Sequence, residues 1–248
     1  MPYNFTVSPD FTPDHLSGWF IFNTWLQRAL DEAIHLELFD SFFDQREAIQ
    51  ADQIDLIYAN PYDAAMLVRD KGFSPLTKPE GKADEAIIAV NSSSGAECVE
   101  DLQPGVKVAT TDDPDVHMMG LIMLEPADLD TKNIQLNIRD SFVLVAKDII
   151  RGDCEAGIFL AEAYNDLSSI AKSQLRVLVK SEIQIIHHAL MVGPRLAQKK
   201  DSLMQVLLSM TDDIKGKGVL QNLGFSGWKA VNEEESEFMI DLMDTLMV

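Results

Sequence analysis

The sequence predicts an α/β protein of two lobes, each a mostly parallel sheet flanked by helices. Strand-like and helix-like segments alternate along almost the whole chain, which is typical of parallel strands joined by crossover helices. The alternation comes in two sets, and the polar stretch TKPEGKADE at residues 77–85 is the best candidate for a crossing between them. A chain of 248 residues is long enough to bury a sizeable core in such an arrangement.

Each element follows from hydrophobic spacing and from residues that start or stop a helix. Apolar residues recur at helical spacing over residues 15–33, which predicts a helix there. Pro61 and Gly72 mark the start and the end of another helix, expected at residues 61–72. The first set comprises strands at 3–8, 34–39 and 54–59 with helices at 15–33, 41–53 and 61–72. In the second set we expect strands at 85–91, 106–111, 134–139, 155–161, 175–181 and 185–193, with helices at 95–102, 115–127, 141–153 and 162–174. The chain ends in helices at 195–210, 216–225 and 236–248.

This order predicts a discontinuous first lobe. We expect lobe 1 to contain residues 1–82 and the returning C-terminal helices of residues 194–248. Lobe 2 is then the inserted β/α unit of residues 83–193. Trp19 and Trp25, on the first helix, are expected to pack in the core or between the lobes.

Charge and composition exclude several classes of protein. The formal net charge is -20, which disfavours nucleic-acid binding because neutralising phosphates requires clustered Lys and Arg. The sequence has no apolar run of about 18 residues, so we expect no membrane span. The first residues lack the pattern of a secretory signal, which predicts a cytoplasmic protein if Met1 is the native start and a periplasmic one if a signal peptide was removed. Cys98 and Cys154 are expected to be reduced thiols.

Several segments together resemble a known family. In order they are IDLIYANPYDAAMLVRDKGF, VEDLQPGVKVATTDDPD, IIRGDCEAGIFLAEAYNDL, LRVLVKSE and GKGVLQNLGFSGW. Their order and spacing are similar to those of the phosphate/phosphite/phosphonate substrate-binding family, a branch of the type 2 periplasmic-binding-protein fold. The resemblance covers nearly the whole chain. It implies two lobes that close on a small ligand held in the interlobe cleft, a transporter or sensor as partner, and no required cofactor.

The sequence departs from this family where the family binds phosphonate. A Ser-Thr-Ser-Gly stretch is typical there, whereas this chain has Asp115, Val116, His117 and Met118. The resemblance also places Ser141 where the family often has a His at the next helix start. Carboxylates and an imidazole replace hydroxyl donors, so we expect a cationic, polyhydroxylated or metal-associated ligand rather than a plain phosphonate.

Candidate ligand-binding residues follow the strands, because ligands of open α/β sheets bind outside the carboxyl ends of strands. Asp113 and Pro114 also have the spacing of a helix cap and first helical residue. Adjacent residues in a strand point to opposite faces, so of His187 and His188 at most one can face a given site. The full set of candidates is Ser8, Asp10, Tyr58, Asn60, Tyr62, Thr111, Asp112, Asp115, His117, Ser141, Glu162 and His188.

Three functions remain open at this point. The first is a small-ligand binding protein of the family just described. The second is a cytosolic enzyme on the same fold, with His117 as general base and Glu162 or Asp112 as its partner. The third is a divalent-metal-binding accessory protein with His117, Asp112 and Glu162 as ligands, although no local metal-binding spacing is present.

Overall fold

The computed structural model describes residues 2–10, 15–182 and 186–246, and the chain divides into two compact units. Unit 1 contains residues 1–83 and 187–248, and unit 2 contains residues 84–186. No helix in these ranges is both long enough and apolar enough to cross a membrane.

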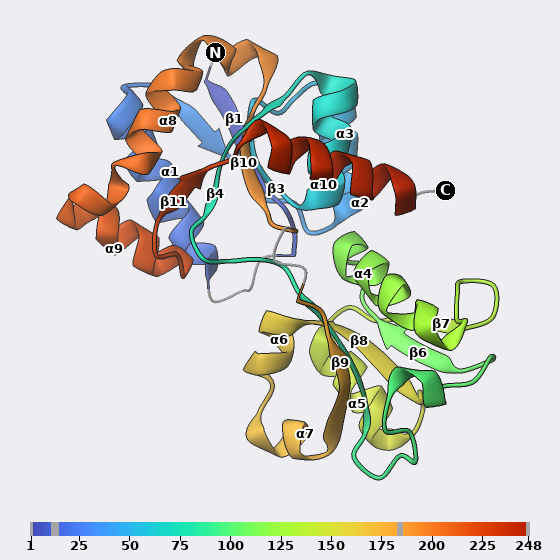
Figure 1. The fold of residues 1–248 in the computed structure, drawn as a ribbon. Helices are drawn as coiled ribbons and strands as arrows, with labels where there is room; N and C mark the ends of the chain where they lie inside the picture. The colour runs from blue at the N-terminus through green and yellow to red at the C-terminus, as the bar shows by residue number, and fades with distance from the viewer. Residues whose placement is uncertain (1, 11–14, 183–185, 247–248) are drawn as a thin grey trace. The chain divides into compact units, whose positions relative to one another are not determined.

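Unit 1 is a six-stranded mixed sheet with helices on both faces (Figure 1). The strand order is β11-β4-β10-β3-β1-β2, and β1 pairs in parallel with both β2 and β3. The strands are β1 (Tyr3–Val7), β2 (Ile34–Leu36), β3 (Leu56–Ala59), β4 (Ser74–Pro79), β10 (Ala189–Val192) and β11 (Trp228–Ala230). One face carries α1 (Leu16–Leu30), α8 (Lys200–Leu208) and α9 (Ile214–Leu223), and the other carries α2 (Phe42–Gln50), α3 (Pro61–Lys71) and α10 (Glu233–Leu246).

The core of unit 1 follows from the alternation of side chains along its strands. In β3, Leu56 and Tyr58 point into the core beneath α1, whereas Ile57 and Ala59 point toward α2 and α3. Trp19 is buried at the centre of an aromatic group on the α1 side. The sheet is therefore buried on both faces, and its strand ends are left to carry polar side chains.

A backbone-to-backbone contact fixes α1 against α9. A Cβ atom at Gly18 of α1 would lie 2.3 Å from the carbonyl oxygen of Asn222 in α9. Only glycine permits this separation, because any side chain would overlap the neighbouring main chain. The two helices consequently form one closely packed pair.

Unit 2 is a five-stranded mixed sheet in the order β7-β6-β8-β5-β9. Its strands are β5 (Ala86–Asn91), β6 (Lys107–Thr110), β7 (Gln135–Ile138), β8 (Ala156–Leu160) and β9 (Leu175–Lys180). Its α-helices are α4 (Pro114–Leu124), α5 (Phe142–Arg151), α6 (Ala161–Asp166) and α7 (Ser169–Ser173). The side chains of α5 pack with Phe159 and Tyr164 in one core, while Gly120 of α4 lies against Ile158 on the other side of β8.

The predicted α/β fold class is confirmed, but the sheets are mixed rather than mostly parallel. In unit 1 β10 runs antiparallel to β3 and β4, and in unit 2 β5 runs antiparallel to β8 and β9. These strands adjoin the two points where the chain passes between the units. Since β10 pairs within the first sheet, the return to unit 1 occurs at residue 187, earlier than the expected boundary at 194.

Local differences have local causes. The segment expected as one helix at 162–174 is two short helices, because Leu167 and Ser168 between them are extended and Ser168 caps the second. The expected helix at 95–102 is a short 3-10 turn, Val99–Asp101. Strands β4 and β11 were not predicted. Residue 185 of the expected strand 185–193 and residues 247–248 of the last expected helix lie outside the described residues.

Candidate functional site

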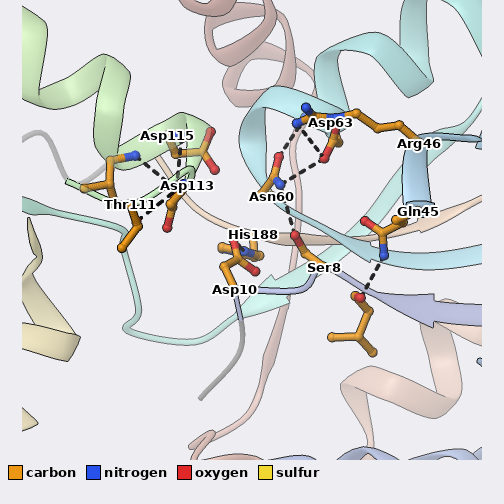
Figure 2. Close-up of polar contacts among 12 residues, drawn as sticks. Ser8, Asp10, Gln45, Arg46, Asn60, Asp63, Thr111, Asp113, Asp115 and His188 are labelled. Atoms are coloured by element: carbon orange, nitrogen blue, oxygen red, sulfur yellow. Dashed lines mark hydrogen bonds and ion pairs between the residues drawn. The ribbon is translucent and has the colours of Figure 1, made fainter. Parts of the chain in front are cut away.

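The carboxyl ends of β1 and β3 bring two predicted residues of unit 1 together. Ser8 follows β1 and Asn60 follows β3, and the strands are parallel neighbours with Val7 opposite Tyr58. The Asn60 Nδ2 atom donates a hydrogen bond to Ser8 Oγ at 3.0 Å (Figure 2). Both residues are buried. Two polar side chains at this edge of the sheet thus have a fixed mutual geometry.

Asn60 is held in turn by Asp63 and Arg46, which sequence reasoning missed. Asn60 caps α3, because its Oδ1 accepts from the Asp63 backbone N–H at 2.7 Å. Its Nδ2 also donates to Asp63 Oδ2 at 3.0 Å, and Arg46 Nε donates to Asp63 Oδ1 at 2.6 Å. The three-residue spacing of Asn60 and Asp63 resembles a capping box and could have revealed Asp63. Arg46 lies on α2, and no sequence pattern around it indicated a contact with Asp63.

This network determines how Ser8 can act. Both N–H groups of the Asn60 amide are donors in it, one to Ser8 and one to Asp63. Ser8 Oγ therefore accepts from Asn60, and its own O–H proton points elsewhere. The arrangement prepares Ser8 to donate a hydrogen bond to an acceptor atom at the strand end.

Three further predicted residues of unit 1 also meet. The Tyr58 ring stacks on the His188 ring, with centroids 5.2 Å apart, and His188 Nε2 lies 2.9 Å from Asp10 Oδ2. His188 precedes β10 instead of lying within it, so the strand alternation assumed for His187 and His188 does not apply. Tyr62 is engaged separately, with the Arg46 guanidinium 4.8 Å from the centre of its ring.

In unit 2 the predicted acidic turn forms the start of α4. Asp113 is the N-cap, and its Oδ1 accepts from the backbone N–H groups of Asp115 and Val116, both at 3.1 Å (Figure 2). Thr111 Oγ1 accepts from the Asp113 N–H at 3.4 Å. Thr111, Asp113 and Asp115 are buried, whereas Asp112 is exposed. A carboxylate of the chain itself therefore occupies the positive end of the α4 dipole.

Thr110, the last residue of β6, is a second buried polar group at this strand end that sequence reasoning did not single out. It is fully buried, and its hydroxyl has no hydrogen-bond partner among the residues described. Buried hydroxyls are normally satisfied by protein, water or ligand. Thr110 therefore joins Thr111 and Asp115 as a candidate for ligand contact.

His117 lies in α4, one turn from its start, and is half-buried. Burial lowers the pKa of its imidazole below the ordinary value of 6.5, because the charged form loses hydration. The side chain is therefore a neutral hydrogen-bonding group near neutral pH. It brings no positive charge to the start of α4.

We expect this burial to make folding stability depend on pH. Just below pH 6.5 the unfolded chain binds a proton at His117 that the folded chain does not, so stability falls as the pH decreases through this range. His117→Gln, which cannot titrate, should lose less stability than the wild type between about pH 7.5 and about pH 5.5. Urea unfolding at both pH values measures this; equal losses in the two proteins would contradict it.

The two remaining predicted residues of unit 2 have separate places. Ser141 caps α5, with its Oγ accepting from the Leu144 N–H at 3.4 Å. Glu162 is exposed in the first turn of α6. In the described part of unit 2, the ligand atoms of His117, Asp112 and Glu162 do not converge into a group able to hold a metal ion. These three residues lie on α4, in the turn before it and on α6.

The sequence matches a family profile over residues 5–236, and the profile describes the periplasmic substrate-binding protein of phosphonate ABC transporters. The chain belongs to this family. Members bind small ligands and work with ABC transporters. No curated protein sequence matches the chain. Nothing in these findings supports the enzyme or the metal-binding alternative.

Solved structures share the fold at low sequence identity. PhnD1 from Prochlorococcus marinus, in complex with methylphosphonate, has a TM-score of 0.82 and 12% identity, covering 99% of this chain and 98% of that one. XAC2383 from Xanthomonas citri, bound to chloride ion, has a TM-score of 0.83 and 13% identity over 99% and 97%. The aliphatic sulphonate binding protein SsuA from Escherichia coli has a TM-score of 0.69 and 16% identity over 99% and 86%.

Proposed function

We propose that this member of the family binds a small amine or polyhydroxylated solute rather than a free phosphonate. The observation that carries the proposal is the start of α4. There the Asp113 carboxylate already accepts the backbone N–H groups of Asp115 and Val116. A helix N-terminus attracts anions through such N–H groups and through its dipole. With Asp113 bound to them, a phosphonate would meet negative charge instead of free donors.

The surrounding residues of unit 2 support the same chemistry. The Asp115 side chain is buried in the first turn of α4, and Asp112 adds an exposed carboxylate beside it. His117 is neutral near neutral pH, because burial lowers its pKa. Ammonium groups and hydroxyls can donate to these carboxylates, and Thr110 can either donate or accept.

The polar groups of unit 1 favour a similar solute on independent grounds. Ser8 is prepared to donate a hydrogen bond, and the Asp10–His188 pair adds further polar atoms. Arg46, which belongs to the network around Asn60, is paired with Asp63. Ser8 thus offers a hydrogen bond to a hydroxyl or carbonyl oxygen, and the cation of this described network is already engaged by a carboxylate.

Isothermal titration calorimetry with three probes tests the proposal. We expect ethanolamine or ribose to bind the purified protein more tightly than methylphosphonate binds. Tighter binding of methylphosphonate would overturn the assignment of the ligand class.

Replacing the cap should shift this preference. Asp113→Ser keeps a good N-cap but removes the negative charge, so the affinity for methylphosphonate should rise about tenfold. Asp112→Asn is the matched control: it removes a neighbouring but exposed carboxylate and should change the affinity only about twofold. Equal effects of the two substitutions in calorimetry would show that general charge, and not the cap, governs binding.

A further inference from the structure

Helix α1 of unit 1 carries large apolar side chains on its outer face as well as on its inner one. Its inner residues Trp19, Phe22 and Leu26 are buried in the core. Its outer residues Phe20 and Ile21 are 52% and 41% exposed. A helix that covers only one core normally has a polar outer face. The outer face of α1 is therefore a candidate interaction surface.

This face forms one wall of a groove between α1 and α9. The groove has a volume of about 660 Å³, and its apolar lining includes Phe20, Ile21, Trp25 and Val219. The two helices that border it are held close together, because Gly18 brings the backbone of α1 against that of α9 at Asn222. A groove of this size between two closely packed helices can hold a few side chains of a partner.

The charge of the groove is opposite to that of the chain. Among the described residues that line it, the charged ones are Arg28 and Lys215, both cations. The whole chain has 40 Asp and Glu residues against 20 Lys and Arg residues. The groove is therefore complementary to a segment that combines apolar side chains with carboxylates.

We propose that the α1/α9 groove docks a helical segment of a partner protein, with apolar residues on one face and Asp or Glu residues beside them. An amphipathic helix in an apolar groove is a common mode of recognition, with anchors at helical spacing. Phe20, Ile21 and Trp25 receive the anchors, and Arg28 and Lys215 pair with the flanking carboxylates. The ligand plays no part in this contact.

Two other occupants fit the observations less well. An anionic membrane would be repelled by a protein of net charge -20. A second copy could offer its acidic helix α10, but α10 packs on the face of the unit 1 sheet opposite to α1. Such a contact would join two different surfaces on successive copies of the protein. Contacts of this kind favour an open-ended filament over a closed dimer.

The probe for the test is a synthetic amphipathic peptide of about 14 residues, or about four helical turns. It carries Leu at helical spacing flanked by Glu, and a second peptide carries Lys in place of Glu. Binding is followed by calorimetry and by the change in total tryptophan fluorescence, to which Trp25 in the groove lining contributes. The variants are Phe20→Ser and the charge reversal Arg28→Glu with Lys215→Glu. Matched controls on α5 of unit 2 are Val143→Ser and Lys147→Glu.

We expect the Glu peptide to bind the wild-type protein and to bind Phe20→Ser about tenfold more weakly. The charge reversal should weaken the Glu peptide and strengthen the Lys peptide, while both control variants bind as the wild type does. Equal binding of the two peptides, or equal loss in the α5 controls, would overturn the proposal. Co-sedimentation with phosphatidylglycerol vesicles, or concentration-dependent self-association lost in Phe20→Ser, would assign the groove to a membrane or a second copy instead.

Discussion

Gly18→Ala is expected to lower the free energy of unfolding by about 3 kcal/mol, because it forces apart two helices that touch through their main chains. The new Cβ would lie 2.3 Å from the Asn222 oxygen and 2.8 Å from its carbonyl carbon. A flexible side chain could move away, but a helical carbonyl can yield only if α9 shifts as a whole. Urea unfolding followed by circular dichroism measures the loss.

A second glycine in the same helix pair provides the control. Gly218 lies in α9, and a Cβ built on it would have no atom within 4 Å. Gly218→Ala should therefore raise stability by about 0.5–1 kcal/mol, since alanine loses less conformational entropy in a helix. Stabilisation by both substitutions would show that the α1/α9 contact is loose in solution.

Asp63→Ala should lower the free energy of unfolding by about 2–3 kcal/mol, the second largest effect that we expect. The Asp63 side chain is 1% exposed, and it accepts hydrogen bonds from Arg46 and from the Asn60 amide. Its removal leaves a buried amide N–H without its acceptor and separates Arg46 from its carboxylate. The expected loss stays at the lower end for a buried pair, because a third of the Arg46 side chain reaches solvent.

The same helix again supplies a matched control. Asp70 of α3 is half-exposed and pairs with Arg69 at 3.3 Å. Asp70→Ala should change stability by less than about 0.5 kcal/mol, as is usual for exposed pairs. A double-mutant cycle of Asp63→Ala with Arg46→Ala isolates the contribution of the pair. A coupling free energy near zero would refute the stabilising role assigned to it.

The elements that the sequence predicted well are those with strong local signals. Pro61 and Gly72 mark the two ends of α3 as expected, with Gly72 in the left-handed region at φ 67°. Strand β4 was missed because SPLTKP has two prolines and a lysine, which are rare in strands. The structure accommodates Pro75 at an irregularity in the pairing of β4 with β10. Tertiary pairing thus overrides local preference there.

The candidate residues divide in a similar way. The contact between Ser8 and Asn60 follows from a topological rule, because parallel neighbouring strands bring their carboxyl ends to one edge. The ion pair of Arg46 with Asp63 joins residues on different helices, and no periodicity in the sequence connects them. Likewise, the cap at Asp113 was readable from Asp-Pro spacing, whereas the burial of Thr110 was not.

Unit 1 is built from two separate segments of the chain, which affects the order in which the two units fold during translation. Strand β10 lies between β3 and β4 in the sheet, although more than half of the chain is translated before it. Unit 2 is continuous, and its ends are joined by a hydrogen bond from the Asp84 N–H to the Ile186 oxygen at 2.8 Å. During synthesis unit 2 should therefore fold first, because the sheet of unit 1 cannot be completed from β1–β4 until β10 has been translated. The nascent N-terminal strands are then the stretch most in need of a chaperone.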